Sequence, residues 1–120
     1  MSKKAVSCPV ETTLHIIGGR WKPLILNHLL EGMKRFGELH RLLRGVSHRT
    51  LAQQLRQLEA EGIVRRKVYQ QIPPKVEYSL TSLGLSLRPI LLAMHEWGEV
   101  YARKTVKFNE VSLSKSYRSS

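Results

Sequence analysis

The clearest alternation of apolar and polar positions lies in the middle of the chain. Leu51, Leu55 and Leu58 recur at the spacing of one helical face. Ser47, before this stripe, is a favoured helix N-cap, and Gly62, after it, is typical of the position just beyond a helix C-terminus. The pattern therefore predicts an amphipathic helix between Ser47 and Gly62, with its leucines in a core and its other face polar.

The polar face of this helix carries groups that can read bases. At 100° per residue, Arg49, Gln53, Arg56 and Gln57 point away from the leucine stripe. Arginine bonds guanine through a fork of two donors, and glutamine pairs with adenine. A solvated surface is the simpler interpretation of one such helix, so the neighbouring segments decide between the two.

Three shorter helices are predicted upstream, at residues 9–17, 21–30 and 36–43. Pro9 suits a first helical turn, and Gly18-Gly19 ends the first helix. Lys34-Arg35-Phe36 is predicted to be a short extended link. The apolar faces of the three helices are expected to comprise Val10, Leu14, Ile17, Ile25, Leu26, Leu29, Leu30, Leu39, Leu42 and Leu43.

The third helix and the central helix are separated by a short turn that contains Gly45. Two short helices joined by a few residues that include glycine are typical of a helix-turn-helix. This arrangement favours base reading over a merely solvated face for the central helix.

A β-hairpin is predicted directly after the central helix. Residues 63–70 are rich in β-branched and basic side chains, residues 75–80 alternate apolar with polar, and Pro73-Pro74 lies between them. The hairpin carries Arg65, Arg66, Lys67 and Lys75, with no acid in residues 62–75.

A basic hairpin behind a helix-turn-helix is typical of the wing of a winged helix. Its natural target is phosphate or the minor groove. Basic residues also protect edge strands from aggregation. Protection of an edge strand would account for one or two lysines but not for the four cations of this hairpin, so a wing is the better interpretation.

A long last helix is predicted from Thr81 to about Lys104, with a kink near Leu85 caused by Pro89. Its apolar stripe is wider than one small domain needs, which indicates a surface for a second subunit. Residues 105–120 hold five serines and scattered charge, and are expected to form a mobile tail.

Net charge narrows the class of partner. The chain has 20 Lys plus Arg against 9 Asp plus Glu, a net charge of +11. This favours a polyanionic partner, nucleic acid above an anionic membrane surface. At 120 residues and 42% hydrophobic composition we expect one domain. No apolar run could span a bilayer and no signal peptide is seen, so a cytoplasmic location is expected.

Enzyme and metal chemistry have little support. The five histidines form no His-x-x-x-His pair, and the single cysteine excludes a multi-cysteine zinc site. No nucleophile elbow or paired carboxylates are seen. We therefore expect no enzyme activity and no cofactor. Two functions remain: a sequence-specific regulator that binds double-stranded DNA, or a non-catalytic module that binds RNA or a partner protein. RNA recognition usually uses aromatic sheets or stacking surfaces, and the sequence pattern predicts neither.

The amino-acid sequence resembles that of the HxlR-type family of bacterial transcription regulators. The matching stretches, in order, are Cys8-Pro9-Val10-Glu11, Ile17-Gly18-Gly19-Arg20-Trp21-Lys22, Lys34-Arg35-Phe36-Gly37-Glu38-Leu39, Leu51-Ala52-Gln53-Gln54-Leu55-Arg56-Gln57-Leu58-Glu59, Ile72-Pro73-Pro74-Lys75-Val76-Glu77-Tyr78 and Glu96-Trp97-Gly98. The resemblance implies a mainly α fold with a small β-hairpin, a winged helix-turn-helix, over residues 8–104. It also implies a homodimer on a pseudo-palindromic DNA operator.

The resemblance extends to residue roles. The first and last helices would form the dimer interface, with Val10, Leu14, Ile17, Leu87, Ile90, Leu91, Met94, Trp97 and Tyr101. The recognition helix would bind DNA through Ser47, His48, Arg49, Thr50, Gln53, Gln54, Arg56 and Gln57, and the wing and its flank through Lys34, Arg35, Arg65, Arg66, Lys67 and Lys75. The family pattern at the start of this helix is Ser-Gln-Arg, where this chain has Ser47-His48-Arg49.

Cys8 has two interpretations. The resemblance implies a thiol that senses thiol-reactive agents, and a helix N-terminus favours the thiolate that such chemistry needs. Since the chain has one cysteine, a protein disulfide would have to join two subunits. Any other effector would act at the dimer interface or on a side chain. The alternative is a small, unreactive packing residue.

Overall fold

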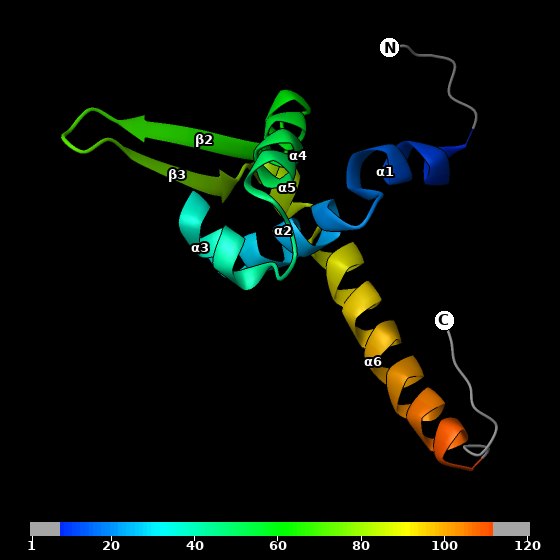
Figure 1. The fold of residues 1–120 in the computed structure, drawn as a ribbon. Helices are drawn as coiled ribbons and strands as arrows, with labels where there is room; N and C mark the ends of the chain where they lie inside the picture. Colours follow the sequence, from blue (N-terminus) through cyan, green and yellow to red (C-terminus); the bar gives the residue numbers. More distant parts are fainter. Residues whose placement is uncertain (1–7, 112–120) are drawn as a thin grey trace. The chain divides into compact units, whose positions relative to one another are not determined.

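The computed structural model describes residues 8–111, with side chains described to residue 105. These residues divide into two compact units that meet between Arg88 and Pro89, and each unit is described by itself. The first unit contains α1 (Pro9–Ile17), α2 (Trp21–Leu29), β1 (Lys34–Arg35), α3 (Phe36–Leu42), α4 (His48–Ala60), β2 (Val64–Tyr69), β3 (Lys75–Leu80) and α5 (Ser82–Leu85) (Figure 1). The second unit consists of α6 (Arg88–Val111) from Pro89 onward.

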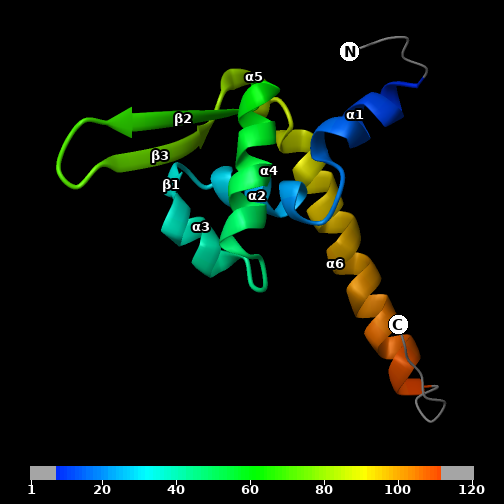
Figure 2. The same cartoon turned by 45° about the horizontal axis from the view of Figure 1, so that its top comes forward.

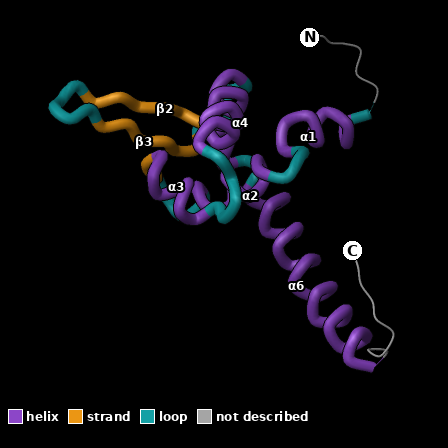
Figure 3. The backbone as a smooth tube through the Cα atoms, viewed as in Figure 1, coloured by secondary structure: helices purple, strands orange, loops and turns teal. Residues whose placement is uncertain are grey.

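The predicted hairpin is the larger part of a three-stranded antiparallel sheet with the order β1-β3-β2. Cross-strand partners of β2 and β3 run from Val64 opposite Leu80 to Tyr69 opposite Lys75. The hairpin projects away from the helices of the first unit, with residues 70–74 at its far end (Figure 3). β1 corrects the expectation of a plain extended link, because Lys34 and Arg35 pair with Tyr78 and Glu77 of β3.

The central helix forms as its sequence pattern predicts. The Ser47 hydroxyl accepts a hydrogen bond of 3.0 Å from the backbone N–H of Thr50, so it satisfies a donor that the helix leaves free. Gly62 ends the segment with φ of +75°, a conformation that favours glycine. α4 packs against α2 and β2 (Figure 2). Its buried leucines, Leu51, Leu55 and Leu58, are those of the predicted stripe.

The core of the first unit consists mostly of aliphatic side chains from its helices and its sheet. Its largest fully buried side chains are Ile25, Leu26, Leu39, Leu51, Leu55, Leu58 and Val64. Leu42 corrects the predicted face of α3, because this side chain is 46% exposed. The helix ends at Leu42, and the chain then turns so that Leu43 and Val46 enter the core instead.

The predicted long last helix is two helices. Thr81 caps α5 as expected, accepting 3.0 Å from the Gly84 N–H, and its hydroxyl also donates to the Gly62 carbonyl at 2.6 Å. A new helix, α6, then begins at Arg88, so Pro89 lies in its first turn, where a missing N–H costs nothing. The break replaces the predicted kink. α6 continues to Val111, beyond the predicted end near Lys104, and residues 112–120 of the predicted tail lie outside the described residues.

Candidate nucleic-acid interface

The polar face of α4 is open to solvent. Ser47, His48, Arg49, Gln53, Arg56 and Gln57 are exposed, whereas Thr50 and Gln54 are half-buried at the flank of the helix. The leucines that anchor the opposite face hold the helix in place, so its guanidinium and amide groups are presented by a rigid element. The side-chain directions predicted from helical geometry are confirmed.

The strand register divides the hairpin cations between two faces. Successive side chains of a strand alternate in direction, and directly paired residues share a face. Arg66 is opposite Tyr78 and lies on the inner face, which is turned toward α4. Arg65, Lys67 and Lys75 lie on the opposite side, which we call the outer face, together with Tyr69 and Glu77.

The inner face and α4 enclose a polar hollow of about 280 Å³. It is lined by Ala52, Arg56, Glu59, Arg66 and Tyr78. Arg56 and Arg66 were predicted in different elements, one on the helix and one on the wing. The structure brings them to a single site, where both guanidinium groups can approach the same anionic group.

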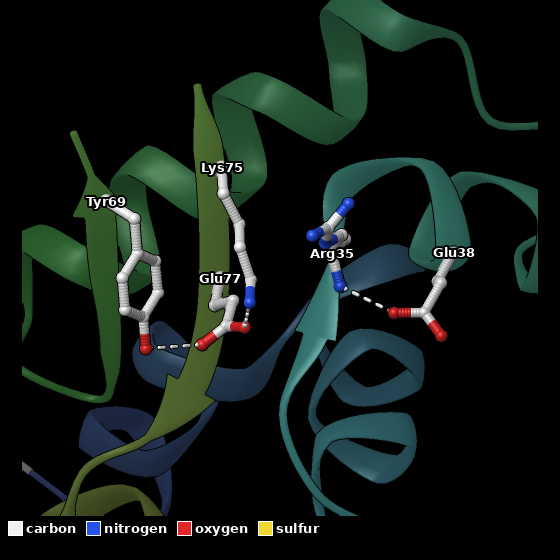
Figure 4. Close-up of polar contacts among 5 residues, drawn as sticks. All are labelled: Arg35, Glu38, Tyr69, Lys75 and Glu77. Carbon is white, nitrogen blue, oxygen red and sulfur yellow. Dashed lines mark hydrogen bonds and ion pairs between the residues drawn. The ribbon is translucent and has the colours of Figure 1, made fainter. Parts of the chain in front are cut away.

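A cluster of aromatic and charged side chains covers the outer face of the hairpin (Figure 4). The Lys67 and Lys75 ammonium nitrogens lie 4.8 and 4.9 Å from the centre of the Tyr69 ring. The Tyr69 hydroxyl donates to Glu77 Oε1 at 2.9 Å, and Lys75 Nζ lies 3.3 Å from Glu77 Oε2. The sequence reasoning missed Tyr69 and Glu77, which the alternation of the strands could have placed beside the lysines.

Glu77 is therefore surrounded by donors and cations. The hydrogen bond from Tyr69 lowers the pKa of the Glu77 carboxyl below its ordinary value of 4.5, and Lys75 and Arg35 lower it further, against an opposing effect of desolvation. The carboxylate is thus ionised at neutral pH and is paired with Lys75.

The two flanking cations of β1 differ in availability. Lys34 Nζ lies 3.2 Å from Glu31 Oε1, and its side chain is only 14% exposed. Arg35 is exposed, and its backbone N–H donates to Glu38 Oε1 at 2.9 Å, which holds the start of α3 (Figure 4). Of the two side chains, that of Arg35 is the more accessible to solvent.

His48, at the start of α4, stacks its ring on Phe36 and His40 of α3. The sequence indicated His48 alone, because nothing in the spacing of α3 reveals which of its side chains meets the next helix. The structure thus ties the first residue of the predicted recognition helix to the helix before it.

The predicted interface residues fall into two groups. Ile17 and Leu91 are each 4% exposed and Leu87 is half-buried, so within one chain these side chains are already covered to a large degree. The other predicted residues are open: Val10 is 65% exposed, Leu14 57%, Ile90 40%, Met94 46%, Trp97 68% and Tyr101 56%. On α6, the Trp97 and Tyr101 rings stack at 5.1 Å, and an apolar groove is lined by Pro89, Ile90, Ala93, Met94 and Trp97.

Cys8 is exposed and occupies the N-cap position of α1. Its carbonyl accepts from the Thr12 N–H at 3.1 Å, so the backbone of Cys8 begins the helix. The Cys8 side chain is therefore accessible to solvent, as the predicted thiol role requires.

Two further properties of the described residues concern metal binding and membrane crossing. Within that range, no three His, Cys, Asp or Glu side chains are grouped closely enough to hold a metal ion. Among the described helices, none has the length and apolar character that crossing a bilayer requires.

Comparison with protein families identifies this architecture. The family model described as an HxlR-like helix-turn-helix matches residues 16–106, which include α2, the helix-turn-helix and the sheet. The chain belongs to the HxlR family. The resemblance inferred from the spaced motifs is thereby confirmed, and with it the winged helix fold.

Named relatives of this HxlR-family chain are transcription regulators. It is 56% identical over 92 residues to the uncharacterized HTH-type transcriptional regulator YybR of Bacillus subtilis (strain 168). These residues make up 77% of this chain and 74% of YybR. It is 55% identical over 94 residues to the HTH-type regulator YdeP of the same organism, covering 78% and 73%. We therefore describe the chain as a transcription regulator with a helix-turn-helix fold.

Among solved structures, the redox regulator HypR in its oxidized form superposes with a TM-score of 0.75 at 56% identity, covering 78% of this chain and 96% of HypR. The diamide-treated YodB of B. subtilis superposes with a TM-score of 0.66 at 35% identity, covering 81% and 97%. The first of these proteins is named in an oxidized form, and the second was treated with diamide.

Proposed function

We propose that this HxlR-family regulator binds double-stranded DNA in a sequence-specific manner, as a homodimer. The observation that carries the proposal is the exposed face of α4, where Arg49 and Gln53 stand on a rigid helix beside a basic hairpin. No catalytic group or cofactor is needed for this role.

The two elements would divide the work. α4 would enter the major groove, where Arg49, Gln53 and neighbouring side chains bond base edges. Arg65 and Lys67 of the hairpin would meet phosphates, which adds affinity without sequence information. The net charge of +11 supports the same partner, since duplex DNA attracts a strongly basic protein at any sequence.

Dimer formation is supported by uncovered apolar side chains. α1 presents Val10 and Leu14, and α6 presents Met94, Trp97 and Tyr101 to solvent. Large exposed apolar surfaces in a protein of this size mark association sites. A two-fold dimer would place two α4 helices about 34–36 Å apart, one duplex turn, and so would read a pseudo-palindromic operator.

A mobility-shift experiment tests DNA binding. Duplexes are selected by the full chain from a random pool, and binding is then measured with RNA and random duplex as competitors. We expect the selected duplex to resist both competitors. Arg49→Ala should weaken the selected duplex by about 1–3 kcal/mol and relax one base position. Equal weakening of selected and random duplex would make Arg49 a phosphate contact, and preferential competition by RNA would favour an RNA-binding module.

We further infer that Cys8 is the site of thiol control. Its exposure at the start of α1 and the redox names of HypR and YodB support this role. In an intersubunit disulfide, two Cys8 thiols lose two electrons and two protons to an oxidant such as diamide. Diamide should then abolish operator binding by the wild type but not by Cys8→Ser. Equal responses of the two proteins would exclude the role.

A further inference from the structure

The contact between α3 and the first residue of α4 is built from three rings. The His40 and His48 ring centres lie 3.9 Å apart with planes inclined by 10°. The Phe36 and His48 ring centres lie 5.7 Å apart with planes inclined by 14°. Phe36 and His40 are one turn apart on α3, so their rings meet His48 from the same helix. We call these three residues the ring stack.

This arrangement uses the faces of the His48 ring and leaves its edge free. His48 is exposed, whereas Phe36 and His40 are half-buried. In the part of the chain that the structure describes, neither ring nitrogen of His48 takes part in a hydrogen bond or ion pair. A neutral imidazole has one donor and one acceptor in its ring plane. His48 therefore keeps both groups available beside Arg49.

The ring stack also removes freedom that an exposed side chain normally has. A side chain that is ordered only on binding loses rotamer freedom, which weakens binding by about two- to tenfold. Two aromatic contacts from α3 hold the imidazole before any partner arrives. A hydrogen bond from such a ring is made with a fixed direction, so it discriminates between base edges better than a mobile side chain does.

We propose that His48 is a specificity-determining residue of the DNA interface, and that Phe36 and His40 are positioning residues that hold its imidazole through the ring stack. The proposal rests on the DNA binding proposed above. Its ligand is a base edge in the major groove, such as N7 or O6 of a purine, which accepts from the imidazole N–H.

A simpler role for the ring stack would be to stabilise the turn between α3 and α4. The two roles differ in what they change. Loss of a stabilising contact lowers the melting temperature and weakens selected and random DNA alike. Loss of an orienting contact lowers the ratio of the two affinities and is restored by any flat ring at position 40.

The experiment measures the affinity ratio of the selected duplex to random duplex for the full chain and for four variants: His48→Ala, His40→Ala, His40→Phe and the double variant His40→Ala/His48→Ala. We expect His48→Ala to lower the ratio about tenfold, the scale of one base contact. We expect His40→Ala to lower it by about two- to fivefold, the scale of one ordered side chain. His40→Phe, the matched control, should keep the wild-type ratio, and the double variant should equal His48→Ala.

NMR of the free protein gives a readout that does not depend on DNA. The ring protons of His48 should be shifted upfield by the neighbouring rings, and His40→Ala should remove much of this shift while His40→Phe keeps it. An unchanged shift in His40→Ala would overturn the proposal.

The DNA measurements give further outcomes that would overturn the inference. An unchanged ratio in His48→Ala, or equal ratios for His40→Phe and His40→Ala, would exclude it while leaving the proposed function in place if Arg49→Ala still relaxes specificity. Failure of the wild type to prefer any duplex would overturn both the inference and the proposed function.

Discussion

Glu77 is the acidic member of the cluster of aromatic and charged side chains on the outer face of the hairpin. Its carboxylate holds the Tyr69 hydroxyl and the Lys75 ammonium group, each through one oxygen. The residue therefore has two opposing effects: it orders the hairpin, and it competes with phosphate for Lys75. Both effects can be measured on the same variant.

Glu77→Gln should change stability in a pH-dependent manner. Because the folded-state pKa of Glu77 is lowered, its contribution to stability is fully present above the ordinary value of 4.5 and is lost as the pH falls through the folded pKa. The difference in melting temperature between the wild type and Glu77→Gln should thus be largest near neutral pH and vanish in acid. A difference that grows toward acid would contradict this sign.

The same substitution should strengthen binding to random duplex DNA, because it removes a negative charge and releases Lys75. The steepness of the salt dependence should increase by about one unit if Lys75 then meets a phosphate. Weaker binding at every salt concentration would instead show that Glu77 is needed to shape the hairpin.

Gly84 is a second single position with a large expected effect. A Cβ atom at this position would lie 2.3 Å from the Ile63 carbonyl oxygen, in backbone that cannot move aside easily. Gly84→Ala should lower the free energy of unfolding by about 1–3 kcal/mol in denaturant titration. Gly98→Ala is the matched control, because a Cβ there meets nothing within 4 Å. Equal stability of the two variants would show that the contact with Ile63 relaxes.

At the scale of elements, removing cations from the two faces of the hairpin should have different effects on the salt dependence of DNA binding. Arg65→Gln and Lys67→Gln remove cations of the outer face, and Arg66→Gln removes the inner cation beside Arg56. Each true phosphate contact that is lost should reduce the slope of log affinity against log salt by about one unit. We expect the reduction for Arg65→Gln and Lys67→Gln, the proposed phosphate contacts of the outer face, and not for Arg66→Gln.

The salt dependence of DNA binding by these variants shows which face of the hairpin, if either, contacts phosphate. If Arg66→Gln changes the slope and the outer variants do not, the phosphate lies in the hollow beside α4. If all three variants keep the wild-type slope, the hairpin is not part of the interface.

Most elements could be predicted because local chemistry specifies them. Ser47, Gly62 and Thr81 act where their side chains or backbone freedom suggested. β1 could not be predicted, since two residues form a strand only when β3 lies beside them. The helix break before Arg88 was missed because a proline suits both a kink and a first turn.

The exposed polar face of α4 could be predicted from the sequence, but the side-chain contacts around it could not. Helical periodicity placed Arg49 and Gln53 on the open face correctly. The Tyr69–Glu77 pair depends on strand register, and the ring stack depends on how α3 meets α4, and both are tertiary properties.

At the scale of the whole molecule, assembly should depend on the open face of α6. Trp97 is 68% exposed, so Trp97→Lys removes little from the core of one chain but places a charge in the apolar groove. Analytical ultracentrifugation should show a dimer for the wild type and a concentration-dependent shift to monomer for the variant. Operator affinity should fall with it, because two linked half-sites bind more tightly than one.

Leu92→Gln supplies the control for this prediction. Leu92 also lies exposed on α6 but does not line the groove. This variant should remain dimeric, and a monomeric Leu92→Gln together with a dimeric Trp97→Lys would place the interface on another face of the helix.

The two-sided hairpin has a consequence for insertions and deletions. Deleting one residue within β2 would shift every following side chain by one position, so Lys67 would turn inward and Val68 outward. Added residues in the turn at 70–74 leave the pairing of the strands unchanged. Length variants of this wing should therefore be tolerated at its tip and rejected along its strands, and grafting a longer tip should extend the reach of the wing along DNA without disturbing α4.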